Sequence, residues 1–162
     1  MLENKHATGD GIPRVYLDNC CYGRPYDDNR QQRVRMESGC KVEIQGMIRR
    51  GELTLVSSSF LIWENNRRRD LAMRDSIYQF IHGNTRKFVF GTEDPSITRT
   101  MNEVRSHGIE TMDAYHISSA IYAGCDYLIT TDDKMLRYKV DGMEIVTPVQ
   151  FIMRSEGNEI QR

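Results

Sequence analysis

Two short apolar runs in this chain each end in an aspartate. The segment 14–18 reads Arg-Val-Tyr-Leu-Asp, and the segment 127–132 reads Tyr-Leu-Ile-Thr-Thr-Asp. Runs this short and this rich in β-branched and aromatic residues are typical of buried strands in a parallel sheet. Ligands of open parallel sheets bind outside the carboxyl ends of the strands, so the runs predict Asp18 and Asp132 at one edge of a sheet.

Weaker strand segments and helical patterns alternate with these two runs. Gly51 and Gly124 follow two of the helical patterns, at the position where a left-handed residue ends a helix. The alternation predicts an α/β protein, a three-layer α/β/α sandwich with a central parallel sheet. Further strands are expected at 53–57, 87–90 and 144–147, and helices at 28–50, 71–81, 95–105, 112–123 and 133–138. Gly39 and Gly46 leave open whether 28–50 is one unbroken helix.

The length of 162 residues suits a single domain. We expect an N-terminal tail over 1–12, a domain over 13–154 and a C-terminal tail over 155–162. No apolar run has membrane-spanning length and no secretory signal is evident, so a cytoplasmic protein without a membrane partner is expected. The four cysteines lack metal-binding spacing, which favours reduced thiols.

A net charge of −1 excludes a polycation that coats nucleic acid. The 22 basic residues are nevertheless mostly arginine, the side chain suited to bidentate phosphate contacts. Compositional drift explains the excess of arginine equally well, so charge alone does not show whether the chain contacts nucleic acid.

Two further acids are candidates for the same sheet edge. Asp113 opens a helical pattern whose apolar residues share its face, so its side chain is expected to point toward the sheet. Glu64 closes the segment 60–64, directly after a run of three serines. A cluster of carboxylates without Cys or His selects Mg²⁺ or Mn²⁺.

Each acid also has a simpler interpretation. Asp18, Asp113 and Asp132 can each cap a helix or interact with its dipole, and Glu64 can be a solvated helix residue. These interpretations leave unexplained why all four lie at the expected edge. His116 lies one helical turn after Asp113 and can be a general base or a core histidine; we leave it out of the catalytic set.

The motifs around these acids resemble the PIN-domain family. The segment 16–28, Tyr-Leu-Asp-Asn-Cys-Cys-Tyr-Gly-Arg-Pro-Tyr-Asp-Asp, is similar to the opening of a PIN domain. The segment 56–64, Val-Ser-Ser-Ser-Phe-Leu-Ile-Trp-Glu, resembles the family's serine-then-glutamate segment. The most distinctive likeness to the family lies in two consecutive segments. They are Asp-Ala-Tyr-His-Ile-Ser-Ser-Ala at 113–120 and Gly-Cys-Asp-Tyr-Leu-Ile-Thr-Thr-Asp at 124–132. The resemblance runs from about 14 to 153 and implies a PIN-like, Rossmann-like fold.

The PIN resemblance implies a metal-dependent endoribonuclease that hydrolyses RNA phosphodiester bonds with Mg²⁺ or Mn²⁺. Position by position, it implies that the catalytic and metal-binding set is Asp18, Glu64, Asp113 and Asp132. Supporting polar residues are then Asn19, Thr130 and either Ser57 or Ser58. Asn19 departs from the threonine or serine usual in the family, which puts the role of a hydroxyl there in doubt.

Arginines near the acids are candidates for RNA contact, although a charge run is usually a solvated face. Phosphate contacts of this kind position a strand without reading its sequence. The candidates are Arg24, Arg67, Arg68 and Arg69.

The resemblance extends to the VapC group of toxin ribonucleases, which implies an antitoxin protein as partner and a homodimer. A solitary PIN protein is an equally open interpretation, as is a non-catalytic PIN-fold module that binds protein or RNA. Other acid-rich folds fit poorly. An aspartate-nucleophile phosphatase requires Asp-x-Asp where this chain has Asp18-Asn19-Cys20, and the motif order does not suit a receiver domain.

Overall fold

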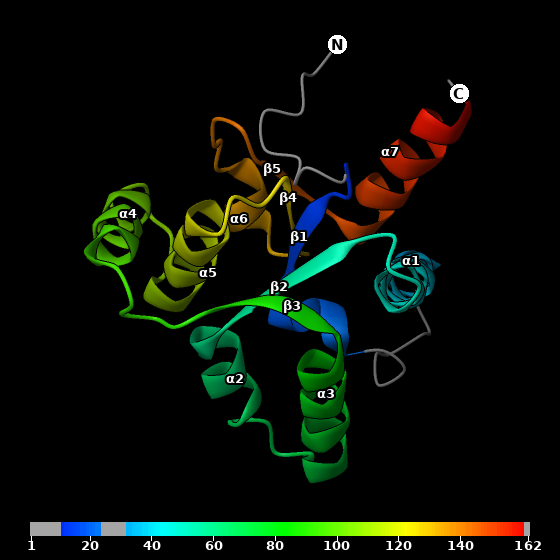
Figure 1. The fold of residues 1–162 in the computed structure, drawn as a ribbon, viewed down its shortest axis with the longest axis horizontal. Helices are drawn as coiled ribbons and strands as arrows, with labels where there is room; N and C mark the ends of the chain where they lie inside the picture. The colour runs from blue at the N-terminus through cyan, green and yellow to red at the C-terminus, as the bar shows by residue number, and fades with distance from the viewer. Residues whose placement is uncertain (1–10, 24–31, 161–162) are drawn as a thin grey trace.

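A five-stranded, fully parallel sheet forms the centre of the molecule (Figure 1). The computed structural model describes residues 11–23 and 32–160. The strand order is β3-β2-β1-β4-β5, so the first strand lies in the middle. The strands are β1 (Arg14–Leu17), β2 (Thr54–Ser58), β3 (Thr85–Val89), β4 (Tyr127–Ile129) and β5 (Glu144–Val146).

Helices cover the sheet on both sides. In Figure 1, α4 and α5 lie on one side and α1 and α7 on the other, while α2 and α3 lie below the β2–β3 edge. This arrangement confirms the predicted α/β sandwich. The helices are η1 (Asn19–Tyr22), α1 (Gln32–Arg49), α2 (Ser59–Asn65), α3 (Leu71–Asn84), α4 (Pro95–Arg105), α5 (Thr111–Tyr122), α6 (Asp133–Arg137) and α7 (Pro148–Ile160).

The helix ends follow the sequence signals. Gly51 and Gly124 adopt φ of 77° and 69°, the left-handed conformation expected after α1 and α5. α1 continues without a break through Gly39 and Gly46. The first four residues of the expected helix at 28–50 lie outside the described residues.

α7 was not expected from the sequence. It begins with Pro148 in its first turn, where proline is favoured, and buries Phe151 against Tyr127 of β4. Because α7 runs through Ile160, the expected C-terminal tail at 155–162 begins inside a helix.

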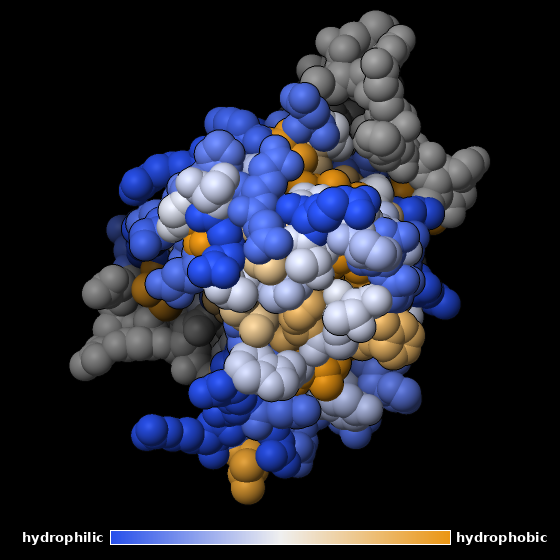
Figure 2. Space-filling model, turned by 90° about the vertical axis from the view of Figure 1, so that its left-hand side faces the viewer, coloured by the Kyte–Doolittle hydropathy of each residue, from blue (hydrophilic) through white to orange (hydrophobic). Residues whose placement is uncertain are grey.

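The core consists of the sheet and the inner faces of its helices. Val15, Tyr16 and Leu17 of β1 are fully buried, as expected for a central strand. On the face that carries α4 and α5, hydrophobic residues gather among hydrophilic ones (Figure 2). All four cysteines are free, and no described helix is long and apolar enough to cross a membrane.

Candidate metal centre

Asp18 follows β1 directly and is held rigidly at the carboxyl edge of the sheet. Its backbone N–H extends the ladder by donating to Ile129 O at 3.0 Å. Its Oδ2 accepts from Thr130 Oγ1 at 2.7 Å, and its Oδ1 accepts from the Asn19 N–H at 2.7 Å. The residue is 6% exposed, so neighbouring protein groups fix the direction in which the carboxylate points.

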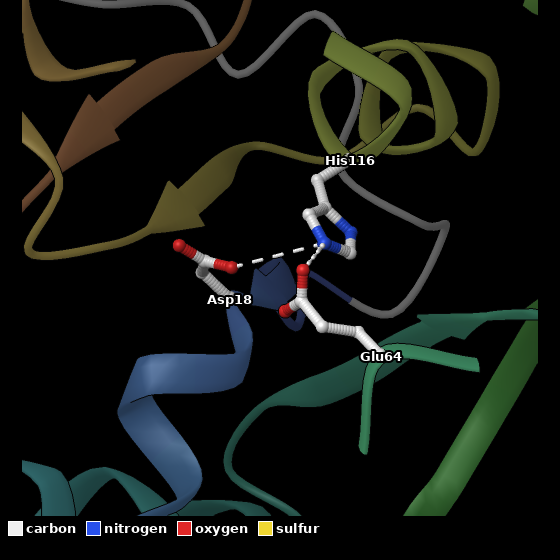
Figure 3. Close-up of side chains that lie close together, drawn as sticks. All are labelled: Asp18, Glu64 and His116. Atoms are coloured by element: carbon white, nitrogen blue, oxygen red, sulfur yellow. Dashed lines mark hydrogen bonds and ion pairs between the residues drawn. The ribbon is translucent and has the colours of Figure 1, made fainter. Parts of the chain in front are cut away.

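Glu64 and His116 complete a tight group with Asp18 (Figure 3). His116 Nε2 lies 3.5 Å from Glu64 Oε2 and 3.9 Å from Asp18 Oδ1. One oxygen or nitrogen atom from each residue lies within 4.8 Å of the other two. The three come from segments that are distant in the sequence: the end of β1, α2 and α5.

The orientation of His116 is set by Tyr16. The Tyr16 hydroxyl lies 2.7 Å from His116 Nδ1 and 2.7 Å from Ser58 Oγ, and all three residues are buried. Ser58 Oγ also accepts from the Leu61 N–H and so caps α2, the helix that carries Glu64. Because Nδ1 is engaged by Tyr16, Nε2 is the nitrogen that faces the two carboxylates.

The histidine and the glutamate stabilise each other's charge. Burial lowers the pKa of His116, but the hydrogen bond to Glu64 and the charges of Asp18, Glu64 and Asp113 raise it more, so the net shift is upward. Burial raises the pKa of Glu64, but hydrogen bonds from His116 and Asn19 and the charges of His116 and Arg68 lower it overall. Negative Glu64 beside protonated His116 is therefore the favoured pairing in the absence of a cation.

Asp113 and Asp132 lie outside this tight group, but the charge of Asp113 interacts with those of Asp132 and of the group's two carboxylates. Burial, followed by repulsion from Asp18, Asp132 and Glu64, raises the pKa of Asp113 to about 6, although His116 opposes the shift. Asp132 caps α6 by accepting from the Met135 N–H at 3.0 Å, and its own N–H donates to Thr130 Oγ1. Thr130 thus links Asp18 and Asp132.

These residues suit a divalent cation. Burial and, after it, repulsion from the other carboxylates raise the pKa of Asp113, and a cation placed among the four acids relieves the repulsion. The oxygen donors of Asp18 and Glu64 suit Mg²⁺ or Mn²⁺.

His116 is the site residue that sequence reasoning underrated. The signal was present, because His116 lies three residues after Asp113 and shares its helix face. What the sequence could not show is that the imidazole reaches Glu64 through Nε2 while Nδ1 contacts buried Tyr16. The predicted role of Asp18 as a cap is also real, since it accepts from the first N–H of η1.

The two serines left open by the sequence have different surroundings. Ser58 belongs to the Tyr16–His116 network, whereas Ser57 Oγ lies 2.9 Å from Thr85 Oγ1 on β3. Only Ser58 therefore touches the group that orients His116.

The candidate RNA-contacting arginines also differ in their surroundings. Arg68 is engaged by protein groups: Nη2 donates to both Asn19 O and Asn19 Oδ1, and Nε donates to Asn65 Oδ1. Arg67 is exposed and its guanidinium lies 4.6 Å from the centre of the Trp63 ring. Arg69 is exposed as well, and Arg24 lies outside the described residues.

Comparison with known proteins supports the fold alone. No protein-family model matches the chain, and no curated protein matches it. Among solved structures, it is similar to a chain from the crystal structure of VapBC2 from Rickettsia felis bound to a DNA fragment from their promoter. The match has a TM-score of 0.53 at 14% identity and covers 83% of this chain and 98% of that chain. A shared PIN/VapC-like fold agrees with the resemblance found in the sequence motifs.

Proposed function

We propose that this chain is a divalent-metal-dependent endoribonuclease. The observation that carries the proposal is the convergence of Asp18, Glu64 and His116 within 4.8 Å at the carboxyl edge of the sheet. Asp113 and Asp132 add further negative charge beside them. In a parallel α/β sheet, this edge is where ligands bind.

The chain's own residues have distinct parts in the proposed reaction. Asp18 and Glu64, with Asp113 and Asp132, would hold the cation, and Thr130 keeps the Asp18 carboxylate in a fixed direction. Bound there, a divalent cation supplies a nucleophilic water and neutralises charge on the phosphate oxygens. His116, oriented by Tyr16, holds a proton at Nε2 between the carboxylates.

A non-catalytic binding module has less support. Burying Asp18 beside other carboxylates disfavours folding unless the charges have a partner, and a pure scaffold gains nothing from that arrangement. The intact set of acids therefore favours an enzyme.

The direct test is cleavage of RNA. Purified protein with Mn²⁺ or Mg²⁺ should cut a single-stranded RNA internally, EDTA should abolish the activity, and a single-stranded DNA of the same sequence should serve as comparison. Asp18→Asn is the key variant. If Asp18→Asn cleaved RNA at the wild-type rate, the nuclease proposal would be wrong.

We extend the proposal to the toxin of a toxin–antitoxin pair. The support is the fold shared with a chain of VapBC2, together with the VapC-like motifs. Such a protein would bind a small antitoxin, and a homodimer would be its working form. Co-purification from the native host, followed by recovery of RNA cleavage when the partner is removed, tests this extension.

A further inference from the structure

A basic depression lies along α6, the helix that Asp132 caps. Lys134 and Arg137 of α6 and Lys139 just after it line a hollow of about 620 Å³, which is closed on its other side by the loop between α4 and α5. We call this surface the basic groove and define it by Lys134, Arg137 and Lys139. Its position follows from the fold, because α6 starts where β4 reaches the carboxyl edge of the sheet.

Two of the acids lie close in the chain to residues of the groove and of the depression that adjoins it. Lys134 is two residues from Asp132 in the sequence. Gly108 and Ile109 line both the basic groove and a second depression, which extends to Met112, the residue before Asp113. A chain lying in the two depressions would therefore pass from α6 to the start of α5, beside two of the site's acids.

The charges of the basic groove are available to a ligand. Lys134, Arg137 and Lys139 are exposed, and within 11–23 and 32–160 their side chains form no ion pair or hydrogen bond. Glu103 is the acid that lines the hollow. Three cationic side chains without such partners, against one carboxylate, leave an excess of positive charge along the hollow.

Aromatic side chains add a second kind of contact. The rings of His107 and Tyr138 lie 5.4 Å apart in a tilted arrangement along the same hollow. Rings beside cationic side chains are the combination by which proteins bind single-stranded nucleic acid, through stacking and phosphate contacts.

We propose that the basic groove binds backbone phosphates of a single-stranded RNA next to the bond that is cleaved. The inference rests on the proposed nuclease function, since it places the strand that the metal centre cuts. RNA is favoured over an acidic peptide because the elements that line the groove and the adjoining depression lie next in the chain to Asp132 and Asp113, the acids near which a phosphodiester must lie. Phosphates on one side of the scissile bond would lie in the groove while that bond meets the acids.

The test compares two double charge reversals in the full-length protein. One is Lys134→Glu with Arg137→Glu. The matched control is Arg86→Glu with Lys87→Glu, which changes net charge equally at exposed positions of β3, on the opposite edge of the sheet. Binding of a single-stranded RNA oligonucleotide is measured in EDTA at several salt concentrations, and cleavage is measured with Mn²⁺. Thermal unfolding midpoints confirm that both variants are folded.

We expect the groove variant to bind RNA about tenfold more weakly than the control. Its log–log salt slope should be shallower by about 1.4, because two phosphate contacts to a single strand are lost. In the cleavage assay, the weaker binding should raise KM and leave kcat nearly unchanged. Equal binding and equal KM in the two variants would overturn the inference while leaving the nuclease proposal intact.

Two other outcomes point elsewhere. If wild-type protein neither binds nor cleaves RNA, the proposed function fails and the inference fails with it. If the groove variant loses affinity for a polyglutamate peptide but keeps its affinity for RNA, the groove is a protein-binding surface and the inference is wrong.

Discussion

The two halves of the acidic site are built differently. Asp18, Glu64 and His116 form a largely buried, hydrogen-bonded half, in which the raised pKa of His116 favours a positive charge beside the two carboxylates. Asp113 and Asp132 form a more open half, in which burial and then repulsion from neighbouring carboxylates raise the pKa of Asp113 to about 6. The first half is organised before any cation arrives, whereas the second stores repulsion that a cation would relieve. This contrast predicts that mutations in the two halves will affect activity and stability differently.

The largest effect is expected from Asp18→Asn in the buried half. The amide keeps the size of the side chain but removes the charge that Thr130 and Asn19 hold in place. We expect RNA cleavage to fall by about 1000-fold, which corresponds to about 4 kcal/mol of lost transition-state stabilisation. Initial rates in Mn²⁺ measure this, and Asp126→Asn, at the opposite end of β4, is a control for the substitution itself.

Asp113→Asn should separate activity from stability. Loss of this carboxylate should lower cleavage by about 100-fold, or about 3 kcal/mol. In EDTA, the same variant should be more stable than wild type by about 0.5 kcal/mol, a small gain because Asp113 is only partly buried. Urea unfolding measures the second effect. A metal-free variant less stable than wild type would show that the open half stores no repulsion.

The pH dependence of stability should report the same repulsion. The pKa of Asp113 is about 6 in the folded protein against an ordinary value of 3.8, so the folded state binds this proton more tightly. Its contribution is fully present below about pH 4 and is lost as the pH rises through about 6. In EDTA, the wild type should therefore gain stability relative to Asp113→Asn as the pH falls through that range.

The comparison with Asp113→Asn is needed because protonation of His116 changes the stability with pH in the same direction. Its raised pKa also favours the folded state at low pH. The difference between the two urea series, measured from pH 4 to pH 7.5, isolates Asp113. Parallel curves for wild type and variant would contradict the assigned repulsion.

Tyr16→Phe tests whether the buried half is organised by its hydrogen bonds. The substitution keeps the ring in β1 and removes the hydroxyl that contacts His116 and Ser58. Cleavage should fall by about tenfold, as for partners that orient ligands in metal sites. The effect should lie in kcat and in Mn²⁺ affinity, with RNA affinity unchanged. Tyr127→Phe, at the other end of the sheet, should retain full activity.

The sequence predicted the acids at the edge of the sheet better than the hydrogen-bond network that organises them. Acids after apolar strands show their position directly, because the carboxyl ends of parallel strands meet at one edge. The choice between Ser57 and Ser58 depended on the register of β2, which shifts at Leu55 and Val56 against β3. The role of His116 depended on Tyr16, a residue that reads simply as a buried strand position. α7 was missed because its apolar residues gather at its start, at 149–153, and the polar stretch 154–158 extends the helix without an apolar period.

The smallest predicted effect concerns the connection between Arg68 and Asn19. Arg68 holds Asn19 through two hydrogen bonds, and Asn19 in turn helps lower the pKa of Glu64. Arg68→Ala should therefore reduce kcat by about threefold, less than 1 kcal/mol, because it loosens the buried half without removing a carboxylate. Arg69→Ala is the matched control, since Arg69 is exposed and lies one residue away. If Arg68 contacts RNA instead, its loss should raise KM and flatten the salt dependence of binding. A lower kcat with an unchanged salt dependence of RNA binding would show that Arg68 helps to organise the buried half.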